Sequence, residues 1–494
     1  MHETGAGTSG APVGTPLNRQ RVLVIGLSVV VLTVAVLQTA VVPVLGVIAD
    51  QLDASMVAVS WAVTANLLAA AAATPLIGRL ADLHRKKRVL LVVLTVVLIG
   101  SLLAATTSSL ALLIVARVLQ AASFALYPIS IAILREELPA DRMGSTMAVL
   151  SGTLGFGGGV GLVVVGLLMS GDAGYHRVFW LTTGFTVLVL AIVVVVVPDR
   201  PRSTTGSIDW LGAAGLATGL SAVLLAITQG HSWGWSSPQT VVTVAGGTVV
   251  LAGWWVWERR TAQPLVSIRM LSRRTMLLTN LATIFVGMGL YFAFLGLTLF
   301  VQIPSDPNDP AGYGFGATVL EASVIYLLPG ALTGFVVALV SGRFIDRFGA
   351  RPVLMVAAVA GMAGFLFIAF AHSSPWQVIL ANILANAYIS LGYGALPTLV
   401  IGEVAPGETG IATSMNAIAR TIGSSTAAAL VAVLLGQTTQ AGIPKESSFV
   451  AIFLGGAVTA GLAMVLIALS RERRPALDSP EARYQLRAMN HEWG

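Results

Sequence analysis

The sequence predicts an all-α polytopic membrane protein. Its 494 residues are 56% hydrophobic and only 10% charged, whereas a soluble globular protein carries roughly a quarter charged residues. Apolar stretches of about 20 residues recur along the whole chain, and each is long enough to cross a hydrocarbon core of ~30 Å as a helix. In such a chain the net charge of +6 says little about nucleic acid, and no nucleic-acid partner is expected.

Fourteen membrane spans are expected, separated by polar, charged or Gly- and Pro-containing stretches. They lie near 22–46, 57–80, 89–106, 110–134, 144–169, 178–197, 210–228, 241–257, 276–301, 321–341, 353–371, 377–402, 410–435 and 448–469. Residues 1–18 are small and polar, and we expect a disordered lead-in there. Arg19 and Arg21 then precede an apolar run that is too long for the core of a signal peptide, which indicates an uncleaved first span.

The distribution of positive charge supports this count and orients the chain. Lys and Arg concentrate in cytoplasmic loops, because anionic lipid and the membrane potential resist their translocation. With the N-terminus inside, all but four of the 28 Lys and Arg residues fall on the cytoplasmic side. Arg177 and Lys445 fall outside, and Arg117 and Arg420 fall within spans. We therefore expect a multi-pass protein of the cell membrane with both termini in the cytoplasm.

One charged stretch occurs twice, as GRLADLHRKKRVL at 78–90 and GRFIDRFGARPVL at 342–354. Two duplicated six-helix halves would place its copies six spans apart, but here they follow the second and the tenth spans. Duplication with two inserted spans, the seventh and eighth, is therefore expected. The predicted division is a lead-in at 1–18, an N-terminal six-helix bundle at 19–200, the inserted pair and its connection at 201–262, a C-terminal six-helix bundle at 263–470 and a cytoplasmic tail at 471–494.

The charged stretch resembles the loop signature G-x-L-a-D-r-x-G-r-k/r of the major facilitator superfamily. Further stretches resemble its fourteen-helix drug:proton antiporter branch, in the right order between about residues 35 and 435: WAVTANLLAAAAATPLIGRLAD, RVLQAASFA, IDWLGA, WGWSSP, WERRTAQPLVSIRML and GETGIATSMNAIARTIG. The resemblance implies the major facilitator fold, with two six-helix bundles and two extra inserted helices. It also implies a monomer that exports drugs or natural products by proton antiport and alternating access.

The repeated stretch supplies a candidate cytoplasmic latch. The residues that match the signature are Gly78, Asp82, Lys86 and Lys87 in the first copy and Gly342, Asp346, Arg347 and Gly349 in the second. A carboxylate at a span end can accept hydrogen bonds from the exposed N–H groups of a neighbouring helix start and pair with Arg or Lys. Such a cluster would hold the cytoplasmic side shut until the halves rock apart. The alternative is a charged loop that only anchors the topology.

The two arginines within spans are candidates for a central cavity. An arginine there costs at least ~2.5–3.5 kcal/mol on insertion scales, so it should face protein or water. The resemblance places spans 1, 2, 4, 5, 9, 10, 12 and 13 around the cavity. The expected polar lining is Gln38, Asn66, Arg117, Gln120, Tyr127, Asn280, Tyr291, Tyr326, Asn386, Asn416 and Arg420. Hydrogen bonding between helices is the alternative for each of them.

The chain departs from this branch of the family because no Asp or Glu falls deep in any predicted span. The first span carries VLQTAVVPVLG where the branch has an aspartate, and the fifth reads SGTLGFGGGVG, with Phe156 in place of a proline. Its remaining glycines form a candidate hinge: Gly155, Gly157, Gly158 and Gly159. Glu321, at the outer entrance of the tenth span, is the candidate for proton coupling, and the alternative is a solvated carboxylate at a span end.

Two arginines without an acid should make the cavity positive. Anionic or neutral amphipathic substrates are therefore predicted over quaternary ammonium cations, which need negative charge or an aromatic cage. A lipid or lipid-conjugate exporter of the same fold is the alternative. The expected partners are the substrate and membrane lipid.

Other classes of protein fit the sequence poorly. An intramembrane enzyme is disfavoured because cysteine is absent and all six histidines fall in loops or tails. A channel would need neither duplicated latches nor inserted helices. No GxxxxGK[ST] motif is present, so we expect a proton gradient as the energy source, with no cofactor and no metal.

Overall fold

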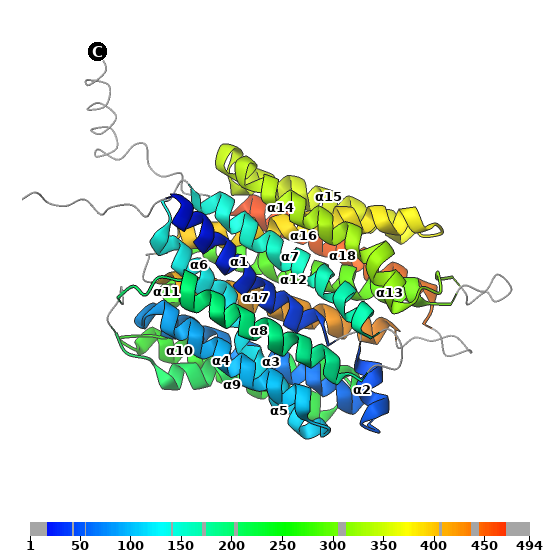
Figure 1. The fold of residues 1–494 in the computed structure, drawn as a ribbon, viewed down its shortest axis with the longest axis horizontal. Coiled ribbons are helices and arrows are strands. Elements are labelled where there is room, and N and C mark those ends of the chain that lie inside the picture. The colour runs from blue at the N-terminus through cyan, green and yellow to red at the C-terminus, as the bar shows by residue number, and fades with distance from the viewer. Residues whose placement is uncertain are drawn as a thin grey trace, which may run out of the picture.

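A computed structural model describes residues 17–41, 44–54, 56–139, 142–169, 174–201, 206–304, 313–404, 408–435 and 444–470. The predicted tail, most of the predicted lead-in and residues 305–312, between the ninth and tenth predicted spans, lie outside them. Within the described residues fourteen helical segments are long and apolar enough to cross a membrane. They run side by side along the long axis of the molecule (Figure 1). The predicted all-α fold with fourteen spans is confirmed.

The helices follow in chain order and come close to the predicted spans, except that α1 ends before the predicted residue 46. They are α1 (Leu17–Thr39), α2 (Leu45–Gln51), α3 (Met56–Leu83), α4 (Lys86–Thr106), α5 (Leu110–Gln120), the 3₁₀ segment η2 (Ala121–Ala125), α6 (Leu126–Glu137), α7 (Met143–Leu168), α8 (His176–Val196), α9 (Trp210–Trp233), α10 (Pro238–Arg260), α11 (Ile268–Leu271), α12 (Arg274–Gln302), α13 (Val319–Glu321), the π-helical segment η4 (Ala322–Leu327), α14 (Leu328–Phe348), α15 (Ala350–Phe370), α16 (Pro375–Gly402), α17 (Thr409–Leu435) and α18 (Glu446–Leu469).

Several helix ends follow from local sequence chemistry. The side chains of Asp209 and Ser237 accept hydrogen bonds from backbone N–H groups in the first turns of α9 and α10, as N-cap residues do. Ser374 forms a capping box at the start of α16. Gly349 ends α14 with a φ of +85°, a left-handed conformation that glycine adopts without a steric penalty.

The first six spans (α1–α8) and the last six (α12–α18) meet along a seam. Helix α3 packs against α17, and α7 packs against α14 and α16. Helix α1 begins and α18 ends at the same end of the bundle (Figure 1). The charged loops after α3 and after α14 lie at that end too, and we call it the basic end. The site described next lies along the seam.

The seventh and eighth spans, α9 and α10, form a hairpin beside this seam. Helix α9 contacts both α3 and α17, so it touches both six-span groups. One apolar cluster joins the hairpin to α11, α16 and α17, and it includes Leu216, Trp254, Ile268, Val400 and Ile411. The hairpin is therefore fastened over the α3–α17 part of the seam.

Candidate functional site

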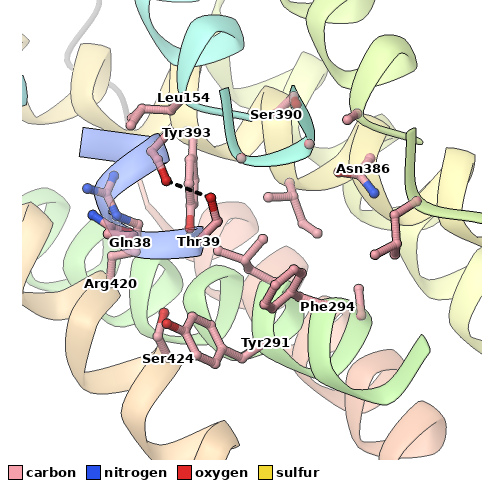
Figure 2. A pocket seen from close by; sticks show the side chains of 18 of the residues that line it. Gln38, Thr39, Leu154, Tyr291, Phe294, Asn386, Ser390, Tyr393, Arg420 and Ser424 are labelled. Carbon is pink, nitrogen blue, oxygen red and sulfur yellow. Dashed lines mark hydrogen bonds between the residues drawn. The ribbon is translucent and has the colours of Figure 1, made fainter. Parts of the chain in front are cut away.

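A central cavity of about 140 Å³ lies between the two six-span groups. Its walls come from α1, α3, η2, α7, α12, η4, α14, α16 and α17, and Figure 2 shows most of the side chains that line it. The polar lining residues are Gln38, Thr39, Tyr291, Asn382, Asn386, Ser390, Tyr393, Arg420, Thr421 and Ser424. No Asp or Glu lies among the described residues of the lining. The cavity is therefore amphipathic, with a single cationic side chain among these residues.

That cation, Arg420, is carried into the cavity wall by a close crossing of α12 and α17. A Cβ atom added to Gly287 would lie 2.4 Å from the carbonyl oxygen of Arg420, so only glycine fits there. The guanidinium carbon lies 4.7 Å from the ring centre of Tyr393 and 5.5 Å from that of Tyr127. Aromatic faces stabilise a cation without neutralising it. The salt bridges among the described residues involve other groups, so Arg420 keeps its charge available.

Arg117 does not line the cavity, although it was predicted to do so with Arg420. Its side chain is buried, with 2% exposed. It donates from Nε to the Ala62 carbonyl at 3.1 Å, and from Nη1 to the Leu37 carbonyl at 3.2 Å and to Gln120 Oε1 at 2.7 Å. Asn66 donates to the Arg117 carbonyl at 2.7 Å. These bonds tie α1, α3 and α5 together, so Arg117 acts as a clamp within the first six spans.

The other predicted lining residues divide in the same way. Four of the predicted residues do line the cavity: Gln38, Tyr291, Asn386 and Arg420. Six further candidates lie outside the described lining, in addition to Arg117: Asn66, Gln120, Tyr127, Asn280, Tyr326 and Asn416. Asn416 donates to Asn280 Oδ1 at 3.0 Å and so joins α17 to α12. A role in transport for any of them stays a prediction.

The sequence reasoning missed most of the small polar lining residues. Thr39, Ser390, Tyr393, Thr421 and Ser424 carried no signal of their own. Thr39, Ser390, Thr421 and Ser424 each lie within four residues of a predicted lining residue, and Tyr393 lies about two helical turns after Asn386. This helical spacing is the signal that was available.

A hydrogen-bonded layer closes the seam between the cavity and the basic end. The hydroxyls of Tyr127 and Ser151 lie 3.2 Å and 2.8 Å from the carbonyl oxygen of Tyr393. Nearer the basic end, Arg135 of α6 donates to Thr409 Oγ1 at 2.6 Å and to the Val404 carbonyl at 2.9 Å. Both sets of bonds join the first six spans to the last six. Arg135 was not among the residues predicted from the sequence.

The first copy of the repeated stretch lies on this closed seam. Asp82 is fully buried and accepts hydrogen bonds from the backbone N–H groups of Gly410 at 3.0 Å and Ile411 at 2.9 Å. These groups open α17, where backbone donors are unsatisfied and the helix dipole favours an anion. Gly78 permits the contact, because an added Cβ would lie 2.1 Å from Ser414 Oγ. The geometry is the one that the latch hypothesis requires, and its role in transport stays a prediction.

The lysines of the first copy also bind groups of neighbouring helices. Lys86 lies 2.5 Å from Glu136 of α6, and Lys87 donates to the Val194 carbonyl at 2.7 Å. They therefore fasten the loop to neighbouring helices of the first six spans.

The second copy lies at the matching place, where α14 meets α7. A Cβ on Gly342 would lie 2.5 Å from Ser145 Cα, so this glycine allows the two helices to touch. Arg347 is exposed, with its guanidinium carbon 5.3 Å from the ring centre of Phe348. The side chain of Asp346 lies outside the described part of the structure, so an acceptor role for it stays a prediction.

The predicted hinge glycines lie in the middle of α7, between α1 and α14. A Cβ on Gly157 would lie 2.4 Å from Leu32 Cδ1, and one on Gly159 would lie 2.3 Å from Ala331 Cβ. Gly158 lines the cavity, and the surroundings of Gly155 lie outside the described residues. The glycines thus permit close packing on both sides of α7, and their action as a hinge stays a prediction.

Glu321 lies at the other end of the molecule, at the start of η4. It is exposed, and its Oε2 accepts hydrogen bonds from the backbone N and from Oγ1 of Thr318, both at 2.9 Å. These bonds hold the pKa of the Glu321 carboxyl below its usual value. The geometry is that of a helix-capping carboxylate.

Comparison with known proteins gives a family match over almost the whole chain. The family model described as Major Facilitator Superfamily matches residues 27–428 and 307–489. An uncharacterized MFS-type transporter of Mycobacterium tuberculosis is 28% identical over 485 residues, which make up 97% of this chain but only 65% of that protein. The tetracenomycin C resistance and export protein of Streptomyces glaucescens is 26% identical over 449 residues, covering 88% of this chain and 79% of that one.

A solved structure shows the same fold. The human organic anion transporter MFSD10 superposes with a TM-score of 0.62 at 17% sequence identity, covering 92% of this chain and all of that one. At this level of identity the likeness concerns the arrangement of the helices.

Proposed function

The chain belongs to the major facilitator superfamily, and we propose that it is a secondary active transporter that exports small amphipathic molecules, with anionic or neutral substrates favoured. The observation that carries this proposal is the cavity with Arg420 in its wall and no described carboxylate around it. A cation with only aromatic faces near it attracts an anionic group and repels a quaternary ammonium. The apolar part of the lining would hold the rest of an amphipathic molecule.

The names of the similar proteins support the class of substrate without deciding it. One is an exporter of tetracenomycin C and another an organic anion transporter. Since this chain is 26% and 17% identical to them, their substrates serve as a guide to the choice of probes.

Alternating access is the proposed mechanism, in a cell membrane with the basic end in the cytoplasm. The basic end holds the charged loops, as the positive-inside rule requires of a cytoplasmic face. In the described conformation the seam is closed there by the bonds of Asp82, Arg135 and Tyr127. Release of these bonds would let the halves rock apart and open the cavity toward the cytoplasm.

Proton antiport is the proposed mode of energy coupling, and the capping hydrogen bonds of Glu321 argue against its predicted role as the coupling group. Because its pKa is lowered, it would take up a proton only in more acidic surroundings than an ordinary glutamate. An anionic substrate with its own carboxyl could carry the proton instead, since the described cavity lining has no carboxylate.

The test is transport by the purified protein in proteoliposomes under an imposed pH gradient. Transport of an anionic and of a cationic amphipathic dye of similar size is measured for four proteins. These are the wild type, Arg420→Gln, Arg420→Lys and Arg343→Gln. Arg343 is an exposed arginine of the basic end and serves as the matched control. We expect the anionic dye to be preferred and Arg420→Gln to lower its transport about tenfold or more, since ~1.4 kcal/mol corresponds to a factor of ten.

Lysine at position 420 keeps the charge but loses the planar group that stacks on the tyrosines, so we expect partial activity. Better transport of the cation, with Arg420→Gln as active as the wild type, would refute the substrate class and leave the family assignment intact.

A further inference from the structure

A second cavity lies on the outer surface of the helix bundle at the basic end, between α3 and α4. Its volume is about 730 Å³. Its wall is apolar and includes Ile77, Leu80, Val89, Val92 and Val96. Val92 is 63% exposed, so the groove faces the surroundings of the bundle, which at this depth are lipid. The groove is separate from the substrate cavity and shares none of its lining.

The mouth of the groove is positively charged. His84, Arg85 and Arg88 line it at the basic end. Arg85 is paired with Asp199 at 2.8 Å, but both side chains are about 40% exposed, at 43% and 40%. Arg88 is exposed and makes no salt bridge with any carboxylate that the structure describes. One guanidinium at the mouth is therefore free of a described acidic partner, and a second is held by a solvent-exposed pair.

The backbone adds to this positive potential. Arg85 precedes the first turn of α4, and no side chain caps that turn. The first N–H groups of a helix lack partners within it and carry the positive end of the helix dipole, and Arg85 and Arg88 of this helix start line the mouth. Lys86, Lys87 and Arg88 stand in the same turn, where cations are unfavourable. An anion at the mouth would relieve this accumulation of positive charge.

We propose that this groove binds an anionic phospholipid of the leaflet at the basic end. The phosphate would lie between Arg85 and Arg88, and one acyl chain would follow the valines of α4. Arg88 and Val96 are ~12 Å apart along the helix axis at 1.5 Å per residue, which is close to the ~15 Å depth of one leaflet. The length, the apolar wall and the charged mouth thus match the parts of one lipid. This site goes beyond the proposed transport function and does not depend on it.

The site adjoins the latch through residues 84–88, which comprise the connection after α3 and the first turn of α4. Asp82 lies in the last turn of α3, and Lys86 and Lys87 fasten this segment to α6 and α8. A phosphate that draws Arg85 away from Asp199 would change the contacts of this segment within three residues of Asp82. Occupancy by lipid therefore acts next to the closed part of the seam.

The experiment is native mass spectrometry of the purified full chain, titrated with phosphatidylglycerol or with phosphatidylcholine of the same acyl chains. The variants are Arg85→Gln/Arg88→Gln for the mouth and Val92→Trp for the wall. Arg343→Gln removes one exposed positive charge at the same end, outside the groove, and is the control. We expect phosphatidylglycerol to bind at least about fivefold more tightly than phosphatidylcholine, as is typical of one basic contact. The double variant should lose the preference for phosphatidylglycerol, and Val92→Trp should lose the bound lipid. Arg343→Gln should keep both the preference and the bound lipid.

Four results would overturn the proposal. They are equal binding of the two lipids, an equal loss in Arg343→Gln, undiminished binding to Val92→Trp, and full displacement of phosphatidylglycerol by millimolar inorganic phosphate, which would indicate a simple anion site. Size-exclusion chromatography and thermal unfolding establish that each variant is folded. If the double variant is not, Arg88→Gln alone and its conservative counterpart Arg88→Lys decide the question, because only the lysine should retain binding.

Discussion

Arg117 and Arg420 are chemically identical side chains within the membrane region, but they differ in the groups that they contact. Arg117 donates to two backbone carbonyls and to Gln120, whereas Arg420 faces the cavity beside two aromatic rings. The sequence predicted both positions as unusual, because an arginine in a span is costly. It could not separate them, since the carbonyl acceptors of Arg117 come from helices far away in the chain.

We therefore predict opposite phenotypes for Arg117→Gln and Arg420→Gln. Arg117→Gln should lower thermal stability, because a buried hydrogen bond to a charged group contributes ~1.5–3 kcal/mol and the shorter, neutral side chain cannot replace all three bonds. Arg420→Gln should leave stability close to that of the wild type and lower transport of anions. Thermal unfolding in detergent and transport in proteoliposomes are measured on the same preparations. Greater destabilisation by Arg420→Gln than by Arg117→Gln would contradict this division.

Glu321 gives a prediction about pH. Its folded pKa is depressed by the two hydrogen bonds from Thr318, so the stabilisation from its charge is present above the ordinary glutamate pKa. That stabilisation is lost only as the pH falls through the lower, folded pKa. The carboxylate should stay ionised between about pH 6 and pH 8. Glu321→Gln should then leave the pH profile of transport unchanged over this range, and loss of coupling to the gradient in this variant would instead establish Glu321 as the coupling group.

At the scale of elements, two spans beside the cavity depart from regular α-helix. The fourth span passes through the 3₁₀ segment η2 just after Gln120, and the tenth passes through the π-helical segment η4 before Pro329. Such segments leave backbone carbonyls without their usual partners. The amide of Asn382, in α16, donates to two such carbonyls of the tenth span. They belong to Tyr326, at 2.8 Å, and to Leu327, at 3.1 Å.

The Asn382 amide should therefore hold the irregular start of the tenth span in place. We predict that Asn382→Ala lowers the stability of the protein by ~0.6–2 kcal/mol, the range found for polar contacts between membrane helices. Thr333→Val is the control, because Thr333 donates only to the Pro329 carbonyl of its own helix at 2.8 Å. Thermal unfolding of the two variants in detergent tests this, and an equal effect of both would argue against a special role of Asn382.

The elements were more predictable from sequence than their irregularities. Long apolar runs and the charge of the loops predicted fourteen spans, because the thickness of lipid fixes the length of a helix. The segments η2 and η4 were not predicted, since the contacts that stabilise them, such as that of Asn382, come from other spans. The separation of α2 from α1 was also missed, although Pro43 stands between them in the sequence and proline interrupts a helix.

At the scale of the whole molecule, Asp82 is the residue whose predicted contact agrees most directly with the structure. The repeated stretch predicted a carboxylate that accepts from a neighbouring helix start, and the structure has Asp82 on the first N–H groups of α17. Only the fold could show which helix supplies these groups. They belong to the other six-span group, so the bond crosses the seam that must open during alternating access.

We predict that Asp82→Asn shifts the protein toward states open at the basic end and lowers transport. Asparagine has no charge and turns an amide toward N–H donors, so it should lose most of the ~1.5–3 kcal/mol that a hydrogen bond to a charged group contributes. A loss of ~1.4 kcal/mol changes the ratio of closed to open states about tenfold.

Because the chain has no cysteine, Arg142→Cys and Arg343→Cys can be spin-labelled directly across the seam. The label distances should become longer and broader in Asp82→Asn than in the wild type. Unchanged distances together with unchanged transport would mean that the repeated stretch only anchors the topology.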